Sequence, residues 1–542
     1  MLNLITDSCF PVQRLDGTVE NIAIWQLTDH LEDNPITAFR APRADLNGAL
    51  VQFAIGLLQT AFMPESHLIW RNHFRNPPSS DDLKKEFQPL ATFFNLMGDG
   101  PRFMQDLLLK GNTPPNSIDK LFIDAPGGNT LKKNTDHFIK RGNIKRLSPM
   151  STAMALFCLQ NAAPSGGVGH RTSLRGGGPL TTLIRREKLW ETLWLAVLDK
   201  PRFMGDNTRW DNHKPEDCFP WLTPTMTSEK NGVVISPETH HPLTVYWAMP
   251  RRIRLAEPIT QNGICDLSGQ EGNCFFTNYE AKNYGNNYEG WVHPLTPHYQ
   301  DKKGGLLPVH GQPGGLAYQN WLGLAFRETG KSTRQPAAII RAYGSRRVPP
   351  EQKEKSGGRM PRIWVFGYDM DNAKARSWID RTMPVIFAGG GEEDNSEHRK
   401  EYEAAVKDLI QAARYASGIL LQQYKAAIVR KGVTIKGDLS FINARFWELT
   451  EPGFLNLAES LADDPEDAVE RKEQWLKDLR NAALALFDKL TEVRSIEIGN
   501  PERPITARNN LGKYTWYEGK KFREQAGLQP LPKKTAKAGG KS

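Results

Sequence analysis

Short apolar runs, separated by loops rich in glycine and proline, make up the longer N-terminal part of the chain. Apolar residues three and four positions apart predict helices at 44–62 and 189–198, although two internal glycines weaken the first. Runs of β-branched and aromatic residues predict strands at 243–255 and 362–368. We therefore expect a mixed α/β domain with irregular loops, and the periodicity favours no named fold.

The pattern changes after a polar, glycine-rich stretch at 388–397, which predicts a flexible linker. Beyond it, apolar residues recur at helical spacing in four stretches joined by short loops, the last at 507–522. Four such helices predict an antiparallel four-helix bundle over 398–524, followed by a disordered basic tail at 525–542. The expected class is α+β, with the large mixed domain occupying 1–387.

The net charge of +9 and a pI near 9.1 favour a polyanionic partner without identifying it. No apolar stretch is long enough to span a bilayer, and the N-terminus lacks the pattern of a secretory signal, so we expect no membrane association. Five scattered cysteines are typical of a reducing compartment, which predicts a cytoplasmic protein.

The sequence contains only weak candidates for a metal site. Cys265 and Cys274 are the only neighbouring cysteines, whereas a tetrahedral zinc ion needs four ligands. Two downstream histidines are conceivable further ligands, but two reduced thiols are the favoured interpretation. His240 and His241 are adjacent, so on a strand they point to opposite faces and suit a shared metal poorly.

Familiar catalytic motifs are absent from the sequence. There is no Walker A loop, no His-Glu-x-x-His pair and no Gly-x-Ser-x-Gly elbow, and Thr172 interrupts the one partial dinucleotide fingerprint. These absences predict a protein that is not an enzyme and has no cofactor. The alternative is a nucleic-acid-processing enzyme whose active site follows no known motif.

Two segments have the composition of a nucleic-acid surface. Residues 131–146 carry six cations around Phe138, and such cations suit phosphates while an aromatic ring suits stacking or wedging. Residues 165–178 combine many glycines with arginines, so their backbone can approach a narrow minor groove closely. A solvated charged loop and a flexible surface loop are the respective alternatives. Further arginines at 251–254 and 341–362 are dilute and are interpreted mainly as solubilising surface.

Several segments resemble one known family. Residues 3–12 are similar to the opening of CasA proteins, and residues 95–105 resemble a family segment that ends in Phe-Met-Gln. The stretches 152–157 and 174–182 look most like the family's signature. CasA proteins are the large subunits of type I-E CRISPR Cascade complexes.

The resemblance implies a DNA-binding role without catalysis. It implies that the chain joins the backbone and small subunits and their crRNA, binds double-stranded target DNA, and presents a surface to an effector nuclease-helicase. Such a protein reads the short PAM beside the target while base pairing with the guide reads the target itself. The resemblance also implies PAM reading through the minor groove, strand opening and R-loop formation.

The resemblance assigns these roles to particular residues. The expected PAM-binding residues are Ser165, Gly166, Gly167, Val168, Gly169, His170, Arg171 and Lys282. The expected strand-separating wedge consists of Asp371 and Asn372, and the expected loop for docking and non-specific DNA contact carries Phe138, Lys140 and Arg141. Cys265 and Cys274 fall where some relatives have more cysteines, so a zinc site there is expected to be degraded.

Overall fold

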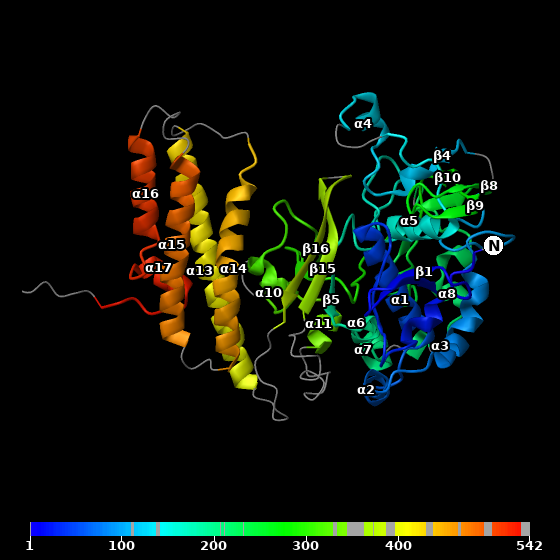
Figure 1. Cartoon of the computed structure of the whole chain (residues 1–542), viewed down its shortest axis with the longest axis horizontal. Coiled ribbons are helices and arrows are strands. Elements are labelled where there is room, and N and C mark those ends of the chain that lie inside the picture. The colour runs from blue at the N-terminus through cyan, green and yellow to red at the C-terminus, as the bar shows by residue number, and fades with distance from the viewer. Residues whose placement is uncertain are drawn as a thin grey trace, which may run out of the picture. The chain divides into compact units, whose positions relative to one another are not determined.

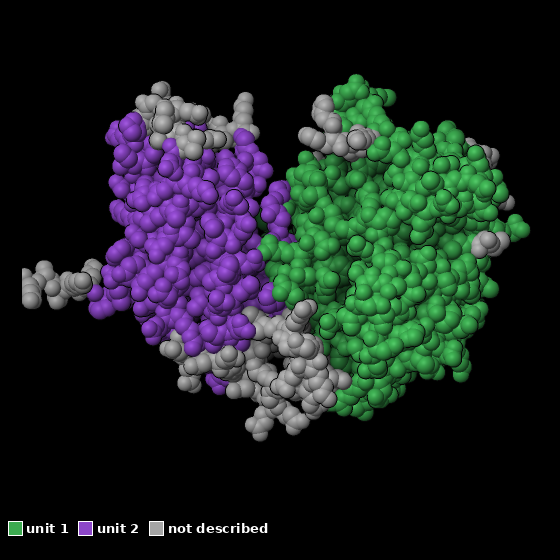
Figure 2. All heavy atoms as spheres, viewed as in Figure 1, with its two compact units in different colours: residues 1–312, 323–383 green, residues 313–322, 384–542 purple. Residues whose placement is uncertain are grey.

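The computed structural model divides the chain into two compact units, which Figure 2 shows in different colours. One unit contains residues 1–312 and 323–383, and the other contains residues 313–322 and 384–542. The residues that the structure describes are 2–109, 113–136, 141–205, 208–210, 212–230, 232–328, 333–343, 362–371, 373–385, 396–429, 437–463, 468–492 and 501–532.

Short helices and small sheets build the first unit (Figure 1). The α-helices described before residue 385 are α1 (Ala44–Ala61), α2 (His67–Arg75), α3 (Ser80–Phe87), α4 (Gly128–Lys132), α5 (Pro149–Ala162), α6 (Leu189–Ala196), α7 (Lys200–Met204), α8 (Pro215–Cys218), α9 (Thr244–Trp247), α10 (Trp321–Leu324) and α11 (Ala338–Ala342). The 3₁₀ helices of this unit are η1 (Ile24–Thr28), η2 (Gln88–Phe93), η3 (Ile118–Leu121), η4 (Thr208–Trp210) and η5 (Pro220–Leu222), whereas η6 (Tyr318–Asn320) belongs to the second unit.

The strands form several small sheets. They are β1 (Phe10–Arg14), β2 (Val19–Ile22), β3 (Ile36–Phe39), β4 (Asn116–Ser117), β5 (Thr181–Arg185), β6 (Val234–Ile235), β7 (Arg252–Leu255), β8 (Ile259–Ile264), β9 (Glu271–Phe275), β10 (Asn278–Lys282), β11 (Asn287–Tyr288), β12 (His298–Gln300), β13 (Leu306–Pro308), β14 (Arg334–Gln335), β15 (Arg362–Asp371) and β16 (Lys374–Pro384). The strand orders are β2-β1-β3, β4-β10-β7, β13-β12-β14 and β16-β15-β5, with the pairs β11-β6 and β8-β9.

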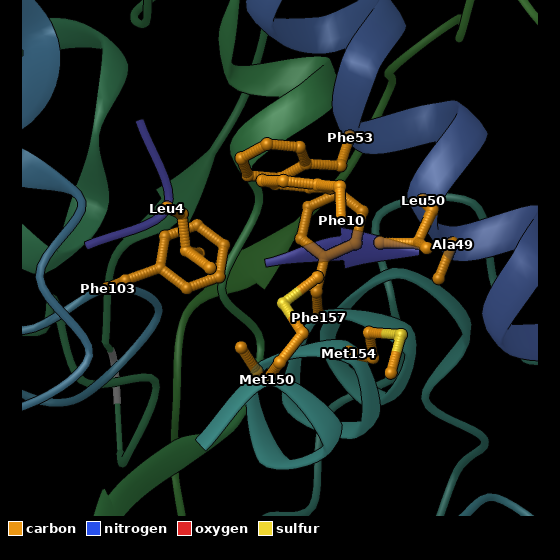
Figure 3. A pocket seen from close by; sticks show the side chains of 10 residues that line it. Leu4, Phe10, Ala49, Leu50, Phe53, Phe103, Met150, Met154 and Phe157 are labelled. Atoms are coloured by element: carbon orange, nitrogen blue, oxygen red, sulfur yellow. The ribbon is translucent and has the colours of Figure 1, made fainter. Parts of the chain in front are cut away.

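An aromatic cluster around α1 forms the core of the first unit. The ring centroid of Phe53 lies 5.5–5.9 Å from those of Phe10, Phe94, Phe103, Phe157 and Trp247. Figure 3 shows side chains from α1, α5 and the N-terminal strand meeting there, around a cavity of only about 10 Å³. Burial of such large rings is the main favourable contribution to folding in this unit.

The two glycines inside α1 have a packing role, which explains why the helix tolerates them. A Cβ atom at Gly48 would lie 2.8 Å from the Phe366 ring on β15, and one at Gly56 would lie 3.1 Å from Cβ of Tyr246 on α9. Because each glycine admits a close neighbour, the lower helix propensity is offset by packing. The predicted helix at 44–62 is confirmed as α1, and that at 189–198 as α6.

The strand predictions have mixed outcomes. The strand at 362–368 is confirmed and extends to Asp371 in β15. The single strand at 243–255 is wrong, because this segment forms α9, then an irregular turn with Pro250, and then β7. A short, continuously buried apolar run does not distinguish a strand from a helix, so its period carried no information.

Long helices dominate the second unit. They are α13 (Ser396–Ile428), α14 (Ser440–Asp463), α15 (Ala468–Glu492), α16 (Glu502–Tyr514) and α17 (Lys520–Gln525). Figure 1 shows α13 to α16 side by side, and α13 packs against each of the others. The predicted α+β class with C-terminal helices is confirmed. The single helix expected at 507–522 is wrong, because the chain turns at 515–519 between α16 and α17.

Residues 313–322 pack with the C-terminal helices, although we expected them in the domain 1–387. The Tyr318 ring stacks on Phe454 of α14 at a centroid distance of 4.3 Å. Its hydroxyl shares a hydrogen bond of 2.8 Å with Thr450 Oγ1. A buried tyrosine with a partner for its hydroxyl is a strong anchor, and nothing in the local sequence pattern identified it.

Two expected boundaries also differ. Helix α13 begins at Ser396, inside the expected linker 388–397, whose residues up to 395 lie outside the described ranges. The segment 525–532, expected in the disordered tail, is packed only at its start and is exposed from 529 onward: Leu528 is buried and its N–H donates to Arg523 O at 3.0 Å. Residues 533–542 are not described. Within the described part of the chain, no helix has both the length and the apolar character needed to cross a membrane.

Candidate nucleic-acid interface

The glycine-rich segment leaves the C-terminal end of α5 and returns to it. The Ser173 N–H donates to Ala163 O at 2.9 Å, and the Gly178 N–H donates to Ala162 O at 3.1 Å. Helix α5 itself begins at Pro149, where the Ser148 hydroxyl caps it by accepting the Ser151 N–H at 3.4 Å. A rigid helix and two backbone hydrogen bonds therefore hold the base of the loop while its tip, 165–169, projects.

The tip requires glycine at two positions for different reasons. Gly167 and Gly169 have φ angles of +64° and +75°, in the left-handed region that favours glycine. At Gly167, no atom of the described part of the chain lies within 4 Å of the place where a Cβ would stand. A Cβ at Gly169, in contrast, would lie 2.9 Å from both Asn283 Cβ and Tyr284 Cδ1. Gly167 is thus open to solvent, and Gly169 is pressed against another segment.

That other segment carries the predicted lysine. Lys282 is the exposed last residue of β10, and the Tyr284 N–H, two residues later, donates to Gly169 O at 2.8 Å. We call this backbone hydrogen bond, with the close packing at Gly169, the latch. The latch brings the predicted glycine tip and Lys282 together, although 113 residues separate Gly169 from Lys282 in the sequence.

A third segment, which contains Ser228, also contacts both sides of the latch. Ser228 accepts hydrogen bonds from Arg171, at 2.8 Å from Nε to Oγ and 3.0 Å from Nη2 to O. The Ser228 hydroxyl in turn donates to Gly285 O at 2.7 Å. Arg171, predicted to meet DNA, therefore braces the loop against residues that follow Lys282. Ser228 carried no signal that sequence analysis could have used.

Charge beneath the tip is partly buried. Arg251 donates to Pro164 O, and burial lowers the pKa of its guanidinium to about 10. Burial, followed by the charge of Arg251, lowers the pKa of His170, so this imidazole is neutral near pH 7. Among the described residues, Lys282 makes no hydrogen bond or ion pair, and its ammonium group is free to meet a ligand.

The predicted wedge lies at the turn between β15 and β16. Asp371 is the exposed last residue of β15, and Asn372 lies outside the described ranges. The β15 strand passes directly over the glycine-rich segment, since a Cβ at Gly178 would lie 2.6 Å from Met370 Cγ. The same close packing therefore fixes one end of the loop against the hairpin that carries the predicted wedge.

The basic loop at 131–146 differs from its expected arrangement. Phe138 and Lys140 lie outside the described ranges. Arg141 forms a two-bond ion pair with Asp136, with Nε–Oδ2 and Nη2–Oδ1 distances of 2.5 and 2.6 Å, and this hydrogen bonding raises the pKa of Arg141. Arg141 thus closes its own loop, whereas Lys132 and Lys133 are exposed.

The two candidate cysteines are not part of a metal-ligand cluster among the described residues. Burial favours the neutral thiol of Cys265, but hydrogen bonds with Ser148, Ser151 and Ser268 outweigh it and lower the pKa to about 7. Their distances to Sγ are 3.3, 3.4 and 3.5 Å. Cys274 is half-buried on β9, and burial raises the pKa of its thiol.

Comparison with known proteins places this geometry in context. The family model described as CRISPR-associated protein Cse1 matches residues 3–486. The structure of Thermus thermophilus CasA (Cse1) is 17% identical, with a TM-score of 0.63 over 95% of this chain and 99% of that one. Thermobifida fusca Cse1 is 19% identical, with a TM-score of 0.65 over 97% of both chains. A chain of a CRISPR RNA-guided surveillance complex is 15% identical, with a TM-score of 0.67 over 95% of this chain and 99% of that one. At these identities the structural likeness shows a shared fold.

Proposed function

Because the chain belongs to the CRISPR-associated Cse1 family, we propose that it is the large, non-catalytic subunit of a crRNA-guided type I-E Cascade complex. In this role it assembles with the backbone and small subunits, binds double-stranded target DNA and helps to recruit the effector nuclease-helicase. A similar fold occurs in a chain of a CRISPR RNA-guided surveillance complex, which supports the assembly.

The latch is the observation that supports PAM recognition most directly. It holds the open backbone of the tip beside the free ammonium group of Lys282. In the minor groove every base pair offers acceptors, and a G·C pair adds one donor, the guanine amino group. A carbonyl of the tip accepts from that donor, while Lys282 donates to the acceptors. Since neither group distinguishes all four base pairs, the resulting PAM preference is degenerate.

Strand opening is assigned to the hairpin turn at Asp371 and Asn372. Insertion of a short polar tip between base steps costs a few kcal/mol of unstacking, which guide pairing then offsets. The packing of Met370 over Gly178 supports a shared rigid frame for both elements. PAM binding would then present the adjacent base step to the hairpin.

Substitutions at Gly167 test the proposal in the assembled, guide-loaded complex. Asparagine and aspartate have similar size and both tolerate the left-handed region, so Gly167→Asn and Gly167→Asp differ mainly in charge. Among the described residues, no atom lies within 4 Å of a Cβ at this position, so both variants should fold. We expect Gly167→Asp to abolish binding to PAM-bearing duplex and Gly167→Asn to weaken it less. Equal affinities of the two variants and the unmodified protein would exclude a groove-facing tip.

Lysine substitutions form a second matched pair. Lys282→Ala should weaken binding to PAM-bearing duplex by about 1–3 kcal/mol, the usual contribution of a specific base contact. Lys302→Ala removes an equally exposed lysine from a turn outside the candidate interface and should have little effect. A uniform loss for duplexes with and without the PAM would instead assign Lys282 to phosphate contact.

A further inference from the structure

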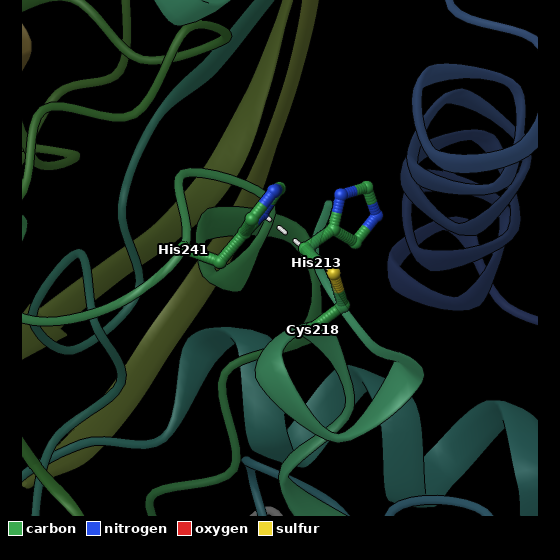
Figure 4. Close-up of side chains that lie close together, drawn as sticks. All are labelled: His213, Cys218 and His241. Atoms are coloured by element: carbon green, nitrogen blue, oxygen red, sulfur yellow. Dashed lines mark hydrogen bonds between the residues drawn. The ribbon is translucent and has the colours of Figure 1, made fainter. Parts of the chain in front are cut away.

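Three side chains that the proposed function does not use lie close together in the first unit. His213, Cys218 and His241 each offer one ligand atom, and these atoms all lie within 4.8 Å of one another. Figure 4 shows the Cys218 thiol between the two imidazoles. Cys218 ends α8, and His241 comes directly before the turn into α9. The sequence prediction that His241 suits a metal poorly assumed a strand, and the structure has a turn there.

The separation of the ligand atoms matches tetrahedral coordination. Cys218 Sγ and His241 Nδ1 lie 3.6 Å apart. A zinc ion with Zn–S of about 2.3 Å and Zn–N of about 2.0–2.1 Å at the tetrahedral angle places its sulfur and nitrogen ligands about 3.6 Å apart. The His213 and His241 rings have their centroids 4.3 Å apart, and exposed His213 shares a hydrogen bond of 3.1 Å between Nδ1 and Trp210 O.

The proton on His241 is already placed for metal binding. The Leu243 N–H donates to Nδ1 at 3.0 Å, which puts the ring proton on Nε2, and Nδ1 also faces Sγ. A cation bound at Nδ1 would replace the Leu243 hydrogen bond. Within the described residues, Nε2 has no hydrogen-bond partner. Burial, with a contribution from His213, lowers the pKa of His241 to about 4, so the ring is neutral near pH 7. Neutral imidazole is the form that binds metals.

We propose that His213, Cys218 and His241 bind a divalent zinc-like cation, with a water molecule in the fourth position. On binding, Cys218 loses its thiol proton to solvent and its sulfur bonds to the cation as a thiolate, while each histidine contributes a lone pair. Zinc combines readily with one sulfur and two imidazole nitrogens, which makes it the expected occupant.

The site would tie the two ends of a segment that matters to the latch. Cys218 and His241 enclose 219–240, and this segment includes Ser228, which accepts the hydrogen bonds of Arg171. A cation bound at both ends restricts the freedom of the intervening chain. This consequence rests on the proposed function, whereas the metal site itself does not.

Metal content and a cobalt titration of the purified full-length chain, without a histidine tag, test the site. We expect about one equivalent of zinc per chain and, with Co²⁺, a thiolate-to-cobalt charge-transfer band. Cys218→Ser should abolish that band, and His213→Ala, at an exposed position, should weaken binding by about tenfold or more. Cys274→Ser removes a thiol outside the cluster and should keep both signals. A cobalt band that survives Cys218→Ser, or no binding by the unmodified chain, would overturn the site.

Hydrogen exchange separates the metal site from its effect on the latch. Chelation of the metal should speed exchange of the Ser228 amide, which donates to Tyr284 O at 3.4 Å. Unchanged exchange in a chain shown to bind cobalt through Cys218 would refute the connection to the latch and leave the metal site intact. Failure of PAM binding in other experiments would leave the metal result unaffected.

Discussion

Replacement of Gly169 by alanine should break the latch, whereas the same change at Gly167 should not. Both glycines have positive φ angles, so each substitution carries a backbone cost of about 1–2 kcal/mol. Only at Gly169 would the new methyl group lie 2.9 Å from Asn283 Cβ and Tyr284 Cδ1. Such overpacking costs about 1–3 kcal/mol, and separation of the segments loses the hydrogen bond to the Tyr284 amide as well.

The difference between the two variants therefore isolates the latch. We expect Gly169→Ala to bind PAM-bearing duplex about 5–150-fold more weakly than Gly167→Ala does, because the latch must re-form before DNA is bound. Hydrogen exchange provides a readout without DNA: the Tyr284 amide should lose protection in Gly169→Ala and keep it in Gly167→Ala. If the Tyr284 amide is equally protected in both variants and their affinities agree, the latch does not organise the interface.

Three further predictions concern other parts of the first unit. Lys132→Ala should reduce the slope of log affinity against log salt by about 0.9 if it meets one phosphate, whereas Arg141→Ala should leave the slope unchanged because Asp136 already neutralises Arg141. Asn372→Ala should slow R-loop formation on closed duplex, and a pre-opened target should rescue it; equally poor binding to both targets would contradict a wedge. The pKa of Cys265 in the folded protein is about 7, below its ordinary value of 9.0. Ionisation of this thiol therefore stabilises the fold fully above pH 9, and the contribution is lost as the pH falls through 7. Urea unfolding should thus show Cys265→Ser to be more destabilising at about pH 9 than at about pH 6, and a pH-independent difference would contradict this.

The sequence predicted elements whose periodicity is long and strong. Helix α1 was found almost to the residue, because apolar positions recur along its whole length. The segment 243–255 failed because its apolar run is short and buried on all sides, which both a helix and a strand satisfy. The predicted boundary between the units missed residues 313–322, because Tyr318 in this segment contacts Thr450, which is 132 residues away in the sequence. Contacts over such separations leave no local pattern.

The same distinction applies to the candidate interface. The glycine-rich tip and Lys282 were identified because their residue types are unusual and resemble a known family. Ser228 and Tyr284 are ordinary residues, and only the folded chain shows that they join the tip to the end of β10. The pairing of Arg141 with Asp136 was likewise hidden, since a count of cations does not show which are already neutralised.

Base analogues in the PAM test the central claim most directly. Inosine lacks the guanine amino group of the minor groove, whereas 7-deazaguanine lacks the N7 acceptor of the major groove. The guide-loaded complex should bind a target duplex about 5-fold or more weakly when inosine replaces the PAM guanine, a loss of about 1 kcal/mol or more, and 7-deazaguanine should have little effect. Loss of binding with 7-deazaguanine, and normal binding with inosine, would contradict minor-groove reading by the glycine tip and Lys282.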